Sequence, residues 1–295
     1  MNTVRHLPLS LRRSIALLAL LALVVPALVA AQAGPPRVSP AATVSQTVGL
    51  STVEISYSRP FARDREIWGE LVPWGEVWRT GANEATTLTL SHDAKIQGKV
   101  LRAGLYGVFT IPSEKGWTVI FNSDAAQWGA FQYDSKLDVL RVEAKAEEAP
   151  HQEQFHIAIE PKDTESATVA VHWGTTRVPF TVSFDTSAIV VETAREQVAA
   201  ATPAEGRMVW NWAQYFYQER TNLDEALEWV TGLANNAPMY WTLALKARIL
   251  AATDQVDAAI DTASQAADMA DTNSPGVGQD LTILQQQVDK WQNKA

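Results

Sequence analysis

Three side chains that can recognise or react with a ligand lie within the segment EVWRTGANEATTLTL, residues 76–90. Arg79 offers a planar donor fork for carboxylates, and Asn83 and Glu84 can exchange hydrogen bonds with hydroxyl groups. The same side chains could instead fasten a turn, with Arg79 and Glu84 paired across Thr-Gly-Ala-Asn, because charge pairs in loops often only maintain shape. We expect Gly81 to serve the backbone of this turn, where a Cβ would oppose the required conformation.

The longer segment around this turn, residues 59–84, is rich in Arg, Trp, Gly and Pro and has neither strand nor helix periodicity. A loop of this length is usually functional or packed on itself. Arg can bind carboxylates, and Trp offers a stacking face for sugars or cations. These residues predict recognition of a polar small molecule or a glycan. The structural alternative is that Trp68, Trp74 and Trp78 cover one end of the domain.

A second loop of similar composition, residues 121–138, contains Asn122, Asp124, Gln127, Trp128 and Tyr133. It lacks the D-x-D spacing of a calcium loop. The complete set of residues that we predict to contact a ligand is Arg59, Asp64, Arg79, Asn83, Glu84, Trp128 and Tyr133.

Motifs for catalysis are missing from the sequence. It has no Cys, no G-x-S-x-G, no H-E-x-x-H, no Gly-rich phosphate loop and no dinucleotide fingerprint. We therefore predict no catalytic residue, no metal and no cofactor. A second hypothesis remains, a hydrolase in which Glu84 is the acid or base and Arg79 holds an anionic substrate. Such an enzyme needs a second acid or base near Glu84, for which Asp64 and Glu76 are available.

One histidine pair deserves a test as a metal site. If Glu160 pairs with Thr168 in a hairpin, His156 falls opposite His172, on the face away from the apolar residues. Two imidazoles rarely suffice for a tetrahedral metal site, and no third ligand is obvious. The alternative is a polar cross-strand pair that faces solvent.

Alternating apolar residues predict a β domain over residues 38–186. About nine short strands are expected, among them 52–58, 86–91, 105–112, 116–122, 137–145, 153–160, 167–173 and 177–185. No helical segment separates these strands, so the pattern favours an antiparallel β-sandwich or jelly-roll-like barrel over a parallel α/β sheet.

A helical domain is predicted over residues 188–295, which makes the fold class α+β in two domains. Five helical segments can be named, over residues 202–219, 222–238, 238–253, 254–270 and 279–294. Thr202 and Glu205 form a capping-box pattern around Pro203. Asp224 and Asp257 align at an offset close to the roughly 34-residue period of tetratricopeptide repeats. An irregular helical bundle is the alternative, and either could dock a protein partner.

The first 33 residues have the pattern of a cleaved secretory signal. Arg5, Arg12 and Arg13 precede an apolar run over residues 14–25, and Ala31-Gln32-Ala33 has the A-x-A form of a cleavage site. The run is shorter than the roughly 20 residues of a spanning helix. We therefore predict a periplasmic or secreted protein without a membrane span after cleavage, the alternative being an uncleaved anchor.

The charge balance argues against nucleic acid as a partner. The 24 basic and 33 acidic residues give a net charge of -9, and loss of Arg5, Arg12 and Arg13 would make it more negative. This charge repels a phosphate backbone, and no basic run compensates for it.

Four segments together resemble the bacterial domain-of-unknown-function family 2911. They are YSRPFARDREIWGELVPWGEVWRTGANEATTLT, GLYGVFTIPSEKGWTVIFN, QWGAFQYDSKLDVLRV and TTRVPFTVSF, in this order, and the resemblance covers roughly residues 38–186. Members of the family are typically exported and often carry a repeat-like helical tail. The resemblance draws attention to Arg59, Arg79, Gly81, Asn83 and Glu84, which match the most recognisable motif of the family, but it implies no activity. The sequence thus favours a non-catalytic binding module of the cell envelope.

Overall fold

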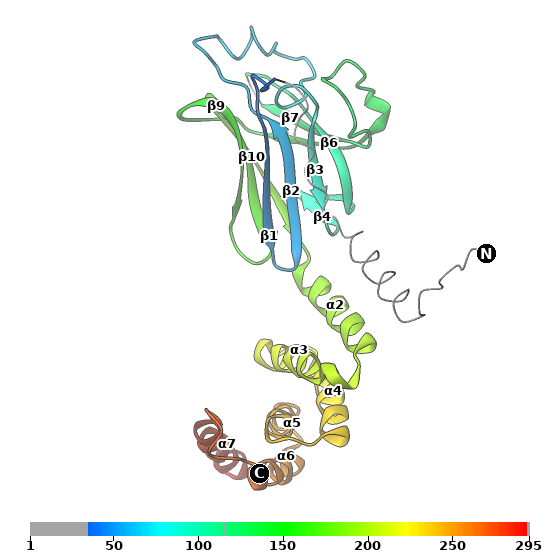
Figure 1. The fold of residues 1–295 in the computed structure, drawn as a ribbon, viewed down its shortest axis with the longest axis vertical. Helices are drawn as coiled ribbons and strands as arrows, with labels where there is room; N and C mark the ends of the chain where they lie inside the picture. The colour runs from blue at the N-terminus through cyan, green and yellow to red at the C-terminus, as the bar shows by residue number, and fades with distance from the viewer. Residues whose placement is uncertain (1–34, 115, 294–295) are drawn as a thin grey trace, which may run out of the picture. The chain divides into compact units, whose positions relative to one another are not determined.

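A computed structural model describes residues 35–114 and 116–293. The predicted signal segment, residues 1–33, lies outside the described residues. The chain divides into two compact units, a β unit that ends at Ser183 and a helical unit that begins at Phe184 (Figure 1).

The β unit consists of two antiparallel sheets. One sheet has six strands in the order β1-β2-β3-β6-β7-β8, and the other has four in the order β5-β4-β10-β9. The strands are β1 (Ala41–Val48), β2 (Ser51–Ser58), β3 (Thr86–Leu90), β4 (Ala94–Ile96), β5 (Lys99–Leu101), β6 (Gly104–Ile111), β7 (Trp117–Asn122), β8 (Asp138–Ala144), β9 (Glu147–Pro161) and β10 (Ser166–Phe184). A 3-10 turn, η1 (Ser135–Leu137), precedes β8.

The alternating sequence pattern explains how the sheets pack. In β2, Val53 and Ile55 are buried, and they lie opposite Leu90 and Leu88 of β3 in the antiparallel register. Side chains of alternate residues share one face of a strand, so these residues form one inner face. The rings of Phe121 in β7 and Phe180 in β10 meet across the sheets, with centroids 6.1 Å apart. The predicted antiparallel sandwich is therefore confirmed.

Several strands differ from the sequence-based prediction. Strands β1, β4 and β5 are not among the segments named from the sequence, because β1 is a half-exposed edge strand with polar residues and β4 and β5 have three residues each. The two segments expected over residues 167–173 and 177–185 form one long strand, β10. Its pairing with β9 is irregular around Gly174, which has a φ of 57°.

The segment between β2 and β3 contains no long regular element. It lies at the end of the sheets away from the β1–β2 hairpin (Figure 1). Trp78 forms an isolated bridge with Thr110 of β6, with both backbone hydrogen bonds at 2.8 Å. These bonds attach the segment to the six-stranded sheet and fix the position of the turn that follows Trp78.

The helical unit contains six α-helices within the described residues. They are α2 (Thr186–Ala200), α3 (Gly206–Glu219), α4 (Leu223–Asn236), α5 (Tyr240–Ala252), α6 (Val256–Asp268) and α7 (Val277–Gln292), and a 3-10 turn, η2 (Pro203–Glu205), precedes α3. The predicted capping box is present, since Thr202 donates its N–H to Glu205 at 2.8 Å. Helix α2 was not named from the sequence. Asp185 caps it by accepting a hydrogen bond from the N–H of Ala188 at 3.1 Å.

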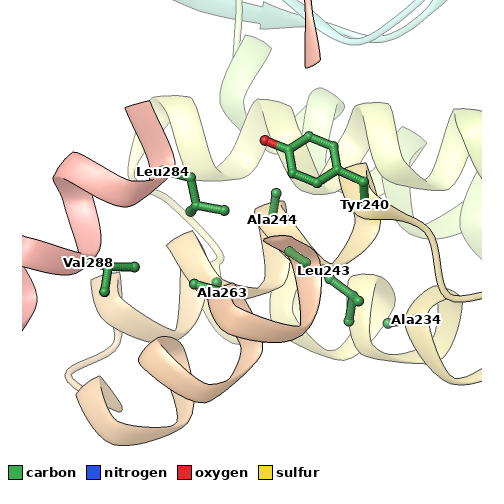
Figure 2. Close-up of a cluster of buried hydrophobic side chains, with 9 residues drawn as sticks. Ala234, Tyr240, Leu243, Ala244, Ala263, Leu284 and Val288 are labelled. Carbon is green, nitrogen blue, oxygen red and sulfur yellow. The ribbon is translucent and has the colours of Figure 1, made fainter. Parts of the chain in front are cut away.

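Small apolar residues form part of the core of the helical unit. Figure 2 shows Leu284 and Val288 of α7 directed towards Ala244 of α5 and Ala263 of α6. Helices α3 and α4 begin at residues 206 and 223, and α5 and α6 begin at residues 240 and 256. Successive helix pairs therefore recur at 34 and 33 residues, close to the tetratricopeptide period. Membership in that repeat class stays a prediction. Among the helices that the structure describes, none is long and apolar enough to cross a membrane.

Candidate functional site

The turn from Arg79 to Thr86 is closed by its own backbone and by one hydroxyl. Thr80 and Asn83 have left-handed φ angles of 55° and 60°, and Gly81 has a φ of 152°. The N–H of Thr86 donates to the carbonyl of Arg79 at 3.1 Å, and the Thr86 hydroxyl donates to the carbonyl of Thr80 at 2.6 Å. The turn is therefore a fixed frame from which the side chains of residues 79, 83 and 84 project.

Asn83 has a structural role, because its side chain connects two segments of the chain. Its Nδ2 donates to the carbonyl of Ser39 at 3.1 Å and to the hydroxyl of Ser58 at 3.3 Å. The side chain thus ties the segment before β1 to the end of β2. These hydrogen bonds occupy the two donors of Asn83, so only its amide oxygen could contact a ligand.

Glu84 pairs with a residue that sequence reasoning did not select. Nη1 of Arg37 donates to both carboxylate oxygens of Glu84 at 2.7 Å. Partial burial would raise the pKa of Glu84, but the hydrogen bonds from Arg37 and from its own backbone outweigh that effect and lower the pKa. The expected pair between Arg79 and Glu84 is therefore wrong. Arg37 gave no local signal, because its partner is 47 residues away.

Arg79 instead lines a pocket of about 270 Å³, which we call the arginine pocket. Its lining includes Arg63, Arg65 and Arg79, with apolar walls from Phe61, Val72 and Trp173. Nε of Arg79 is buried and has no hydrogen-bond acceptor. Burial lowers the pKa of Arg79, but a guanidinium remains charged in proteins.

The tryptophans of the 59–84 segment mostly pack on the end of the sandwich. The ring of Trp68 is 4.7 Å from that of Trp117 and 6.0 Å from that of Trp173, both edge to face. The indole of Trp78 stacks on Trp173 at 6.1 Å. Trp74 is half-exposed and contacts Trp68. The structural alternative therefore describes Trp68 and Trp78 correctly.

Trp128 and Glu84 come together from different loops. They form an isolated antiparallel bridge at the edge of a cleft of about 550 Å³, which we call the Trp128 cleft. Polar residues that line this cleft include Thr43, Ser56, Ser58, Glu84, Gln127 and Trp128. Trp128 is 56% exposed, and the guanidinium carbon of Arg37 lies 5.9 Å from its ring centroid.

The structure does not bring the other three predicted residues to either pocket. Arg59 donates from Nε to the carbonyl of Phe155 at 3.0 Å, and Asp64 is exposed with a φ of 58°. Tyr133 donates its hydroxyl to Asp138 at 2.7 Å. Burial and this carboxylate raise the pKa of Tyr133 to about 12. Their role in ligand binding stays a prediction.

The histidine pair has the predicted register. Glu160 pairs with Thr168, and His156 lies opposite His172. His156 is within 3.4 Å of the Tyr57 hydroxyl, and Nε2 of His172 is 3.0 Å from the carbonyl of Pro150. No group of three potential metal ligands occurs in residues 35–114 and 116–293. The two histidines are therefore cross-strand neighbours, and each ring has a different hydrogen-bonding neighbour.

The two groups of the hydrolase hypothesis lie in different pockets. Glu84 lines the Trp128 cleft, whereas Arg79 lines the arginine pocket. Glu84 is the only carboxylate among the described residues that line the Trp128 cleft. Asp124, from the neighbouring loop, instead accepts the N–H of Ala126 at 3.1 Å. A two-carboxylate arrangement is not assembled around Glu84.

These features define a two-part protein, an antiparallel β-sandwich with two separate pockets followed by a helical unit. Residues 39–182 match the model of the family described as "Protein of unknown function (DUF2911)". The β unit belongs to this family, as its sequence motifs indicated. No curated protein and no solved structure matches the chain significantly.

Proposed function

We propose that the β unit is a non-catalytic binding module and that its ligand is a polyhydroxylated molecule, such as a short saccharide, held in the Trp128 cleft. The observation that carries this proposal is the position of Trp128. Its exposed indole and Glu84 line the same cleft of about 550 Å³, and the backbones of the two residues form a bridge. A volume in this range suits a small ligand.

The chemistry of the cleft fits a sugar ring. An exposed indole presents a flat apolar face on which the C–H face of a pyranose can stack. Glu84 has its pKa lowered, so it stays an ionised acceptor at neutral pH. Each oxygen accepts one hydrogen bond from Arg37, which leaves acceptor capacity for ligand hydroxyls.

Other residues that line the cleft add further polar groups. The hydroxyls of Thr43 and Ser56 are 2.9 Å apart and lie on β1 and β2. Gln127 is buried, with Nε2 bonded to the carbonyl of Asp124 at 3.0 Å and Oε1 without a donor. A buried acceptor without a donor costs about 1–3 kcal/mol.

Titration calorimetry on residues 34–295 with a panel of neutral disaccharides tests the proposal. At least one should bind, and Trp128→Ala should weaken it about tenfold or more, because stacking and burial are lost. Phe131→Ala is the matched control. Phe131 is 86% exposed in the same loop and does not line the cleft. Binding that survives Trp128→Ala, or a panel with no binder, would overturn the proposal.

The same panel separates binding from hydrolysis. A binding module returns each saccharide intact after long incubation, and chromatography of the mixture measures this. Cleavage that disappears in Glu84→Gln but persists in the Phe131→Ala control would instead establish the hydrolase.

Two other parts of the assignment rest on the sequence. We propose export to the periplasm or secretion from the signal pattern over residues 1–33. We also propose that the helical unit docks a protein partner, as stacked helix pairs commonly do.

A further inference from the structure

The arginine pocket concentrates positive charge without any matching negative charge. Three of its lining residues, Arg63, Arg65 and Arg79, are cationic, and no Asp or Glu of the described chain lines it. Asp64 lies between two of these arginines in sequence but is not part of the lining. In a chain with a net charge of -9, this is a local inversion of charge.

Arg79 is the residue that most clearly indicates a site for an anion. Within the described part of the chain, its guanidinium has no ion-pair partner, and its Nε is buried without an acceptor. The two terminal nitrogens are not among the buried unpaired atoms, and Arg79 lines the pocket. A half-buried cation is costly unless an anion or acceptor compensates for it. The fixed turn around Thr80 and Gly81 nevertheless holds Arg79 in this position.

The other two arginines are held by neutral groups. Arg65 donates from Nε to the carbonyl of Ala62 at 2.9 Å and from Nη2 to the carbonyl of Phe61 at 2.6 Å. The guanidinium carbon of Arg63 is 5.9 Å from the centroid of the Phe61 ring. Glu153 accepts the backbone N–H of Arg63 at 2.8 Å and forms no ion pair with its guanidinium.

Most arginines elsewhere in the β unit behave differently. Each of four others contacts a carboxylate: Arg37 with Glu84, Arg102 with Asp93, Arg141 with Asp138, and Arg177 with Glu147 and Glu160. Arg59, outside the pocket, likewise has no carboxylate partner in the described chain and donates to the carbonyl of Phe155. The arginine pocket differs in bringing to one site three arginines without an ion pair among the described residues.

We infer that the arginine pocket is a binding site for a small oxyanion, either a carboxylate on a compact organic molecule or a phosphate group. The guanidinium fork matches both groups and can bind two of their oxygens at once. The volume of about 270 Å³ limits the ligand to a small molecule. The apolar walls from Phe61, Val72 and Trp173 would contact the body of an organic acid.

This site is independent of the Trp128 cleft. The two pockets share no lining residue. Between them, Asn83 holds the carbonyl of Ser39, and the N–H of Arg59 holds the carbonyl of Pro40 at 2.9 Å. A ligand in one pocket can therefore be tested without the other, and failure of either proposal leaves the other standing.

The test uses residues 34–295 and two probes, benzoate for the carboxylate and inorganic phosphate for the phosphate. Titration calorimetry at low salt should show binding of at least one probe, and the affinity should fall as salt rises because the contact is charged. Which probe binds tighter tells whether the source of the oxyanion is an organic acid or a phosphate. Arg79→Met should weaken binding about tenfold or more, and Arg79→Lys should do so less, since it keeps the charge but not the fork.

The matched control is Arg102→Met. It removes the same charge from the same unit, but Arg102 is 80% exposed and lies outside the pocket. Its probe binding should equal that of the unaltered protein. Saccharide binding at the Trp128 cleft should also be unchanged in Arg79→Met.

The unfolding midpoint distinguishes an anion-binding role of Arg79 from a purely structural role in the turn. Because Arg79 has no partner in the described structure, Arg79→Met should leave the unfolding midpoint without probe unchanged or raised. A lowered midpoint would mean that Arg79 holds the turn, and this would overturn the inference. Arg63→Met provides a second variant, since Arg63 is exposed and makes one ring contact. If neither probe binds, or if both probes bind Arg79→Met and Arg63→Met as tightly as the unaltered protein, the site does not exist.

Discussion

Gly81→Ala tests whether the turn is a rigid frame. A Cβ at this position would lie 2.9 Å from the carbonyl oxygen of Ser58 and 3.2 Å from Oγ1 of Thr86. The first atom is backbone of β2 and cannot move without disturbing the sheet. The φ of 152° adds strain of about 1–3 kcal/mol for an L-residue. The overpacked contact adds about 1 kcal/mol, so we expect Gly81→Ala to lower the free energy of unfolding of the β unit by about 3 kcal/mol.

Gly75→Ala separates strain from contact. Gly75 also has a positive φ, 78°, but nothing lies within 4 Å of the Cβ position. Only the left-handed conformation opposes the substitution, so the free energy of unfolding should fall by about 1 kcal/mol. The difference between the two variants gives the contacts of the new Cβ with Ser58 and Thr86 together with the difference in backbone strain between the two φ angles.

Amide hydrogen exchange of β3 is the suitable assay. Its most protected amides report the opening free energy of the β unit. Tryptophan fluorescence would be less suitable, because it would also report on the tryptophans of the helical unit. The melting temperature of the unit should fall by about 6–12 °C in Gly81→Ala. Equal losses in the two variants, or a loss below about 1 kcal/mol in Gly81→Ala, would refute the rigid-frame argument.

Three further predictions concern charges and domain independence. Glu84 has a lowered pKa, so its pair with Arg37 contributes stability above the ordinary value of 4.5 and loses it as the pH falls through the folded value. The side chains of Glu84 and Arg37 are 49% and 35% exposed. Glu84→Gln should therefore lower the free energy of unfolding by less than about 1 kcal/mol. In urea unfolding, it should also weaken the loss of stability at acid pH. The raised pKa of Tyr133, about 12, means that its contribution is complete below the ordinary value of 10 and disappears as the pH rises towards 12. Asp138→Asn should shift the Tyr133 transition in an ultraviolet absorbance titration towards lower pH, and an unshifted transition would contradict the hydrogen-bond assignment. A chain that ends after Ser187 should unfold cooperatively in a calorimeter, and loss of that transition would show that the β unit needs the helical unit.

Periodicity predicted the parts of the fold in which local pattern and burial agree. The hairpin pairing of Glu160 with Thr168, which the sequence suggested only as a condition, is present. The alternation of Val53 and Ile55 predicted β2. Periodicity did not reveal β1, whose alternate residues are exposed. An edge strand of polar residues has no apolar face that would distinguish it from a loop.

In the candidate site, the sequence identified several of the residues but not their partners. The sequence selected Glu84 and Trp128 separately, and the structure joins them at one cleft. It also selected Arg79 but paired it with Glu84, the nearest carboxylate along the chain. The actual partner of Glu84 is Arg37, from the segment before β1.

The sequence by itself determined the family of the β unit, the two sheets, the helical half and the need for glycine at position 81. Each of these depends on local patterns or on motifs that can be read along the chain. Only the tertiary structure decided that Glu84 pairs with Arg37 and that Arg79 has no ion-pair partner among the described residues. Ion pairs form between side chains that the fold places within a few ångströms of each other, and that distance depends on how β1, β2 and the two loops pack.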